Sequence, residues 1–170
     1  RLRCDWSSDV CSSDLFDRDN RGYIYVDGTL DVSGSISSHS GDLSNNESLE
    51  IGVDLEHITQ YTDGKLDEIA IWNDALTSAE ITALYNSGGG LSAASNSGNY
   101  ASSSNPQAYW NFNEGTGTTA YDATSNGNDG TIYGATWSTD VPFTGTTTTS
   151  ALTWSVQAQA SLGSYNDNDN

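Results

Sequence analysis

The stretch from residue 63 to residue 88 constrains the fold most, because its hydrophobic pattern changes from that of a strand to that of a helix. The first half follows the turn dipeptide Asp63 and Gly64 and is a short apolar run, rich in residues that favour strands. Such a run is too short for a helix and fits one buried strand. Its apolar residues are Leu66, Ile69, Ala70, Ile71 and Trp72.

The second half carries the signals of one short helix. Thr77 and Glu80 have the three-residue spacing of a capping box, in which each side chain bonds the backbone N–H of the other. Leu76 and Ile81 flank this box at the positions of a hydrophobic staple. Ile81, Leu84 and Tyr85 share one apolar face of this helix. Gly88 follows as its C-terminal stop.

This stretch resembles the end of a LamG-like domain (laminin G, concanavalin A-like), which is a jelly-roll β-sandwich. Residues 23–36, YIYVDGTLDVSGSI, and residues 49–52, LEIG, resemble earlier strands of the same family. With these strands the resemblance covers residues 16–88 and implies an all-β, antiparallel, partial sandwich that closes with the short helix. The matching closing positions are Gly64, Asp67, Glu68, Ile71, Trp72, Asn73, Ala75, Leu76, Glu80, Ile81, Leu84, Tyr85 and Asn86.

Residues 16–62 also favour antiparallel strands by their pattern alone. The β-rich residues 23–26 end at Asp27 and Gly28, which together are a hairpin turn signal. Leu30 and Val32 continue by alternation on the return strand. The sequence therefore predicts a hairpin here.

The second half of the chain begins a new unit. Residues 89–107 are rich in Ser, Gly, Ala and Asn and predict a flexible linker with almost nothing to bury. Residues 108–143 resemble the opening of another LamG-like domain, through AYWNFNEGTGTTAYDATSNGNDGTIYGATW at 108–137. Residues 144–170 predict a further linker and the start of another segment. The chain begins with Arg and contains no Met, so we expect a piece of a longer protein with tandem repeats.

The two half-domains leave strand edges without partners. In the jelly rolls that the chain resembles, the first and last strands lie side by side. The closing strand, residues 66–72, and the opening strand, residues 109–113, come from consecutive repeats, and each lacks its own partner. Unpaired edge groups are costly when buried, so we predict that these two strands pair with each other.

Residues 1–15 have a different character from the rest. The motif Ser-Ser-Asp occurs twice without apolar periodicity, and both cysteines, Cys4 and Cys11, lie here. A disulfide or half a metal site would be one interpretation. SSDVCSSDL, however, resembles the translation of a sequencing adapter, so we interpret residues 1–15 as a non-native scar and exclude them from the predicted fold.

The charge excludes some partners. With 23 Asp and Glu against 5 Lys and Arg, the net charge is −18, which repels phosphate backbones and anionic membrane surfaces. We therefore expect no nucleic-acid partner. No stretch reaches the ~18 apolar residues of a membrane helix, so membrane insertion is not expected either.

No catalytic pattern is present. Glycoside hydrolases of the resembled fold place Glu residues around a central Asp on one strand, but neither E-x-D-x-x-E nor E-x-D-x-E occurs. Asp67 and Glu68 are adjacent, so on a regular strand their side chains point to opposite faces and cannot act together. The motifs G-x-S-x-G and H-E-x-x-H are absent as well. We expect a non-catalytic module, with a piece of a concanavalin A-like glycoside hydrolase as an alternative.

Calcium is the cofactor that the resemblance implies. Concanavalin A-like domains often hold a structural calcium near their first strand, and here Asp67 would share it with Glu114 and Asp122. The residues from Asp122 onward also fit the first positions of a helix–loop–helix calcium loop, but position 12 is Tyr133 instead of Glu, so that motif fails. Turn formation by Asn-Gly and Asp-Gly accounts for most of this loop.

The aromatic residues allow two interpretations, sugar-stacking platforms or core. Trp72, Trp110, Phe112 and Trp137 fall at alternating strand positions, which favours the core. Tyr121 is among the tyrosines without such a pattern, and nothing singles out a site.

The resemblance implies a secreted or surface-attached bacterial protein whose modules bind carbohydrate or another extracellular partner. A structural or adhesion spacer without a ligand is the alternative.

Overall fold

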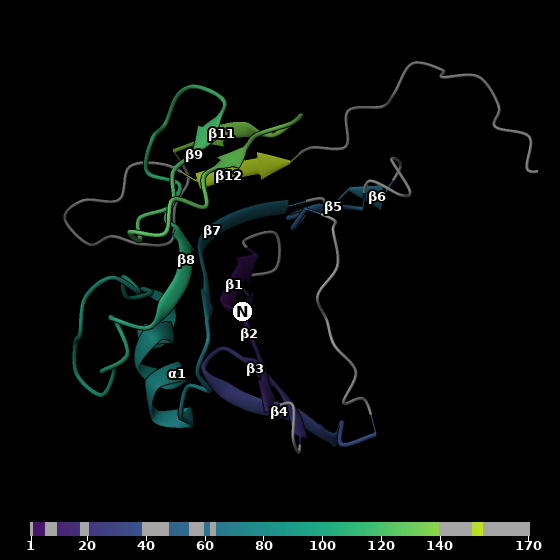
Figure 1. Ribbon diagram of the computed structural model, residues 1–170, viewed down its shortest axis with the longest axis vertical. Helices are drawn as coiled ribbons and strands as arrows, with labels where there is room; N and C mark the ends of the chain where they lie inside the picture. The colour runs from purple at the N-terminus through teal and green to yellow at the C-terminus, as the bar shows by residue number, and fades with distance from the viewer. Residues whose placement is uncertain are drawn as a thin grey trace, which may run out of the picture.

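The computed structural model describes residues 2–5, 10–17, 21–38, 48–54, 60–61, 64–139 and 151–154 of the 170-residue chain. It is an all-β fold, as predicted, with one short α-helix (Figure 1). Among these residues no helix is long and apolar enough to span a membrane. The elements are β1 (Leu2–Asp5), β2 (Val10–Asp17), β3 (Arg21–Val26), β4 (Thr29–Ser35), β5 (Val53–Asp54), β6 (Gln60–Tyr61), β7 (Gly64–Trp72), α1 (Ser78–Tyr85), the 3-10 helix η1 (Asn86–Gly88), β8 (Pro106–Trp110), β9 (Thr119–Ala120), β10 (Gly130–Thr131), β11 (Thr136–Ser138) and β12 (Ala151–Trp154).

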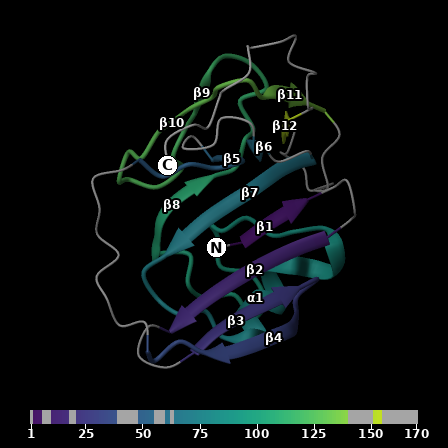
Figure 2. The same cartoon turned by 90° about the vertical axis from the view of Figure 1, so that its right-hand side faces the viewer.

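The main sheet is antiparallel and is built around β7. Its strands follow the order β11-β12-β7-β1-β2-β3-β4, and β8 also pairs with β7. One edge of β7 is paired with β1, while β12 pairs with its first residues and β8 with its last. Figure 2 shows β7, β1, β2, β3 and β4 side by side, with α1 behind them.

The pairing of β7 with β8 confirms the prediction that the closing and opening strands meet. Ile69 lies opposite Trp110 and Ala70 lies opposite Tyr109 in the antiparallel register. Ile69, Ala70 and Tyr109 are each at most 2 % exposed. The two strands are separated by more than thirty positions in sequence, so the segment between them must return the chain to β7.

Helix α1 begins as its sequence predicts, but it ends before the predicted stop at Gly88. Thr77 Oγ1 accepts a hydrogen bond from the Glu80 N–H at 3.3 Å, and Glu80 Oε2 accepts one from the Thr77 N–H at 3.0 Å. Leu76 is buried and packs in the same cluster as Ile81 and Leu84. The helix stops at Asn86, whose φ of 49° is left-handed.

The β3–β4 hairpin turns at Asp27 and Gly28, as predicted. Both residues have positive φ, 50° and 70°, as a tight hairpin turn with right-handed strand twist requires. The turn lies against α1, because the Thr82 hydroxyl donates to the Gly28 carbonyl at 2.8 Å. A Cβ on Gly28 would come within 2.9 Å of the Tyr85 side chain, so glycine is needed at this contact.

The sheet includes β1 and β2, which changes the interpretation of residues 1–15. The sequence led us to exclude these residues from the fold, whereas β1 pairs with both β2 and β7, and β2 pairs with β3. The physical reason is that β3 and β7 each present a backbone edge, and these strands satisfy it. The origin of residues 1–15 as a scar stays a prediction.

The segment 89–107 corrects another expectation. It was predicted to have almost nothing to bury, but Tyr100 is 1 % exposed and Ala93 is 3 % exposed. The Tyr100 hydroxyl donates to the Ala93 carbonyl at 2.8 Å and accepts from Trp72 Nε1 at 3.2 Å. One tyrosine therefore docks this polar segment on the sheet and on α1. Whether residues 16–88 and 108–143 come from consecutive repeats stays a prediction.

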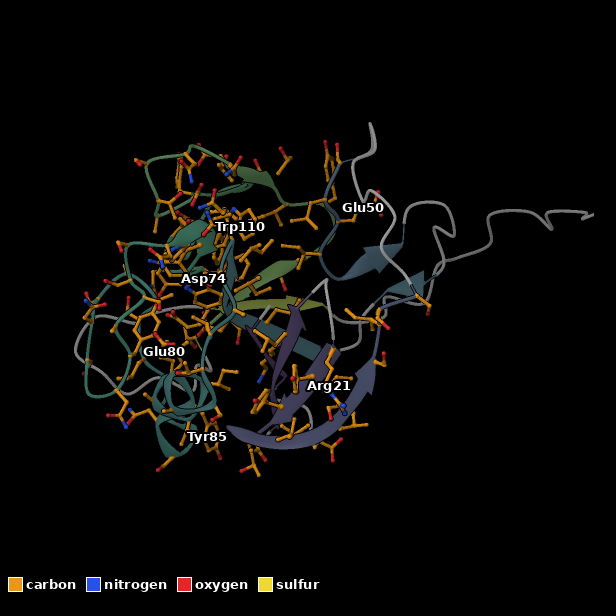
Figure 3. All side chains as sticks on the ribbon, turned by 60° about the horizontal axis from the view of Figure 1, so that its bottom comes forward. Arg21, Glu50, Asp74, Glu80, Tyr85 and Trp110 are labelled. Carbon is orange, nitrogen blue, oxygen red and sulfur yellow. The ribbon has the colours of Figure 1, made fainter. Side chains whose placement is uncertain are left out.

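Two main clusters form the core, one at each end of β7. The first joins Leu66 and Ile69 of β7 to Trp110, Phe112 and Ala120. The second joins α1 to the hairpin and the following segment. In Figure 3 the labelled Trp110 lies above Glu80 and Tyr85 of α1, with Glu80 between the other two. The second cluster consists of Tyr25, Leu76, Ile81, Leu84 and Tyr100.

We expect Tyr100→Ala to lower the free energy of unfolding by about 3–5 kcal/mol, the usual cost of replacing a buried aromatic side chain with alanine. Urea denaturation of the full chain would measure it. Tyr121→Ala is the matched control, since Tyr121 is 59 % exposed and its loss should change stability by less than about 0.5 kcal/mol. Equal effects of the two substitutions would show that segment 89–107 is not docked through Tyr100.

Candidate functional site

A concave site lies beside β8, between the segment that docks through Tyr100 and the loop of residues 122–129. The first wall is held to α1 by Glu80, whose Oε1 accepts from the Ser102 hydroxyl at 2.5 Å. Hydrogen bonds to Glu80 lower its pKa below the ordinary value, although partial burial acts in the opposite direction. The ionised capping residue of α1 therefore also anchors this wall.

The second wall is organised by Asp122. Its Oδ1 accepts from the backbone N–H groups of Tyr109 and Thr124 at 3.0 and 2.9 Å. Its Oδ2 accepts from the Thr124 hydroxyl at 2.8 Å and from the Asn128 N–H at 2.9 Å. Burial alone would raise the pKa of Asp122, but these hydrogen bonds lower it below the ordinary value. An ionised Asp122 therefore shapes the loop and joins it to β8.

Asparagine side chains bond the same loop to Gln107, near the start of β8. The Nδ2 groups of Asn126 and Asn128 both donate to the Gln107 carbonyl at 2.9 Å. The Trp110 indole donates to the Asn128 carbonyl at 2.8 Å. These bonds hold the loop at a fixed distance from the strand, so the space between the two walls is preformed.

The cleft between the walls has a volume of about 320 Å³, at the lower end of the ~300–1,000 Å³ typical of ligand pockets. In the part of the chain that the structure describes, its lining contains hydroxyl and amide groups, small apolar side chains and no charged side chain. Such a lining offers neutral donors and acceptors beside short apolar patches. The lining residues are Ala94, Ser103, Ser104, Pro106, Gln107, Tyr109, Ala123, Thr124, Ser125 and Asn126.

The three predicted calcium ligands occupy different positions. Asp67 is fully buried on β7, while Asp122 belongs to the cleft wall. Glu114 follows β8, and its Oε1 accepts from the Tyr121 N–H at 2.7 Å. Within the described ranges, no group of three or more His, Cys, Asp or Glu side chains has the spacing of a metal site.

These three residues do not form a ready-made shell for calcium. Calcium takes six to eight oxygen ligands, but both oxygens of Asp122 already accept two hydrogen bonds each. Asp67 Oδ2 and Glu114 Oε2 are buried without a hydrogen-bond partner among the described residues. Calcium binding by Asp67, Glu114 and Asp122 therefore stays a prediction of the resemblance.

A buried pair of carboxyl groups escaped the sequence-based interpretation. Asp67 is fully buried and Glu68 is 8 % exposed, although adjacent residues on a regular strand point to opposite faces. The strand is irregular here, because Glu68 has a φ of 51° and the β1–β7 register shifts beside it. The Tyr109 hydroxyl of β8 donates to Glu68 Oε2, so the pair lies at the β7–β8 junction.

Burial dominates the protonation of this pair. It raises the pKa of Asp67 to about 8, and the neighbouring Glu68 adds to this increase. Burial also raises the pKa of Glu68 to about 7, against the effect of the hydrogen bond from Tyr109. The Tyr109 pKa is raised too, mainly by burial and then by Glu68. The two carboxyl groups are therefore held in neutral form in mildly acidic solution.

Comparison with known proteins gives one match. Residues 5–82 match the family model of the concanavalin A-like lectin/glucanases superfamily. No curated protein and no solved structure matches the chain. Residues 5–82 are therefore similar to the LamG-like, concanavalin A-like family that the closing motif resembles. The segment starts at the end of β1 and ends within α1, so it contains β7, whereas the cleft is built by the residues that follow.

Stability should fall as the pH rises from about 4 to about 8. The unfolded chain loses the protons of Asp67 and Glu68 near pH 4, whereas the folded chain keeps them until about pH 7 and 8. Since the folded state binds more protons in this window, the free energy of unfolding decreases with pH. We expect Asp67→Asn to have a shallower decrease and to exceed the wild type in stability at pH 8.

Urea denaturation at several pH values, in the presence of a chelator, measures this effect. The general repulsion within an acidic chain also weakens stability as the pH rises, so a charge-matched control is needed. Asp31→Asn removes an exposed carboxylate on β4 and should keep the slope of the wild type. If the free energy of unfolding fell equally steeply with pH in Asp67→Asn and Asp31→Asn, the raised pKa of Asp67 would be contradicted.

Proposed function

We propose that this protein is a non-catalytic, extracellular carbohydrate-binding module that holds a neutral sugar in the cleft beside β8. The single observation that supports it most is the uncharged lining of hydroxyl and amide groups around a space of about 320 Å³. Sugars present alternating hydroxyl groups and C–H faces, and this lining offers hydrogen-bonding groups next to Ala94, Ala123 and Pro106.

The family of residues 5–82 supports the same ligand class, because the matched superfamily is one of lectins and glucanases. A fold does not by itself specify function, so the proposal depends on the cleft. The buried pair of Asp67 and Glu68 does not supply a catalytic centre to this proposal, since neither residue lines the cleft. We therefore favour binding over glycoside hydrolysis for this part of the protein.

A glycan array with the full chain tests the proposal, and a variant that fills the cleft locates the ligand. Ala94→Trp places an indole in the cleft from an exposed position, so folding should be unaffected. We expect at least tenfold weaker binding of any glycan the wild type recognises, which corresponds to about 1.4 kcal/mol.

Ala79→Trp is the matched control, because Ala79 is also exposed but lies on α1, away from the cleft lining. It should bind like the wild type. Failure of the wild type to bind any glycan would favour a structural or adhesion spacer, and full binding by Ala94→Trp would exclude the cleft as the site.

A further inference from the structure

The hairpin of β9 and β10 exposes two tyrosines that contribute nothing to the core. Tyr121 is 59 % exposed and Tyr133 is 77 % exposed. Their chain neighbours face inward, since Ala120 is 5 % exposed and Ile132 packs against the cluster around Trp110. Large aromatic side chains held on the solvent side of a sheet are typical of binding surfaces.

The register of the hairpin puts both tyrosines on one side. Thr131 lies opposite Thr119, and the Ile132 N–H donates to the Thr118 carbonyl at 2.9 Å, which continues the antiparallel pairing beyond β10. Because side chains alternate along a strand, Tyr121 shares its side with Thr119, and Tyr133 shares the same side with Thr131. We name these four residues the tyrosine strip.

The order of side chains along the strip is aromatic, hydroxyl, aromatic. Extended by one residue beyond the Gly130–Ala120 pair, the register would put Asp129 opposite Tyr121, and Tyr133 follows Asp129 by four positions. At a strand rise of ~3.3 Å per residue, the two rings are separated by on the order of 13 Å. The paired threonine hydroxyls lie between them. A ligand that contacts both rings must therefore be extended and must present apolar faces and hydroxyl groups along its length.

Charge narrows the class of ligand. Asp129 stands beside Tyr121 on the exposed end of the hairpin, and the chain carries a net charge of −18. Nucleic acids and acidic polysaccharides, whose bases or rings could stack on tyrosine, are repelled by this surface. A neutral polysaccharide meets all three requirements of length, hydroxyl content and charge.

We infer that the tyrosine strip is a second binding surface, which takes an extended neutral polysaccharide by stacking sugar rings on Tyr121 and Tyr133. The inference shares with the proposed function the carbohydrate ligand class, but it depends on different residues. The strip lies at the end of the molecule opposite α1, where Figures 1 and 2 show β9 and Figure 2 shows β10.

Pull-down of the full chain on three insoluble polysaccharides, cellulose, chitin and mannan, tests the inference. We expect binding to at least one of them, and at least tenfold weaker binding after Tyr121→Ala and after Tyr133→Ala. Tyr121→Phe and Tyr133→Phe keep the ring and should bind within about twofold of the wild type. Both tyrosines are exposed, so the unfolding midpoints of the variants should match that of the wild type.

Two further variants separate the possible outcomes. Leu49→Ala removes a 63 % exposed apolar side chain outside the hairpin and should bind normally. Ala94→Trp should also bind normally, because the cleft is a different site. No binding to any of the three polysaccharides would overturn the strip, as would binding that either tyrosine-to-alanine variant retains. Loss on Ala94→Trp alone would assign the polysaccharide to the cleft, which rejects the strip and supports the proposed function.

Discussion

The pairing of β7 along both of its edges is the constraint on which the rest of the structure depends. Every backbone N–H and C=O on a buried strand needs a partner, and β7 obtains its partners from β1, β12 and β8. The pairing with β8 brings Trp110 to one core cluster, and Tyr100 of the connecting segment completes the other. The loop of residues 122–129, which forms one cleft wall, is bonded to β8, so a backbone requirement in the sheet helps to position a surface site.

The junction of β7 and β8 also contains an energetically unfavourable feature, the two adjacent buried carboxyl groups of Asp67 and Glu68. A buried ionised carboxylate without partners is far more costly than a neutral one, and the pair avoids this cost by keeping its protons. Both side chains are buried on an irregular stretch of β7, and the Tyr109 hydroxyl donates a hydrogen bond to Glu68. Glu68 thus accepts a hydrogen bond that joins β7 to β8. Ionisation of Glu68 and Asp67 at higher pH is expected to destabilise the same junction.

Local patterns in the sequence were sufficient for β7, α1 and the β3–β4 hairpin. Each of them is specified by neighbouring residues, such as the capping box of Thr77 and Glu80. The docking of Tyr100 was missed because one aromatic residue in a polar segment gives no periodic signal. The burial of Glu68 beside Asp67 was missed because it depends on the segments that cover both faces of β7.

The two proposed binding surfaces lie outside the matched segment of residues 5–82, and this division has a physical reason. The matched segment contributes β2 to β7 and the first residues of α1, whose backbone groups are engaged in pairing. The residues after α1 form loops and a short hairpin, whose side chains are held by bonds such as those to Asp122 and Gln107 and still reach solvent. Binding groups concentrate on such rigidly held loops because a sheet interior has no free groups to offer. The cleft suits a short ligand that is contacted on several sides. The tyrosine strip suits a long chain that is contacted on one side, so the two proposed surfaces would bind carbohydrates of different length.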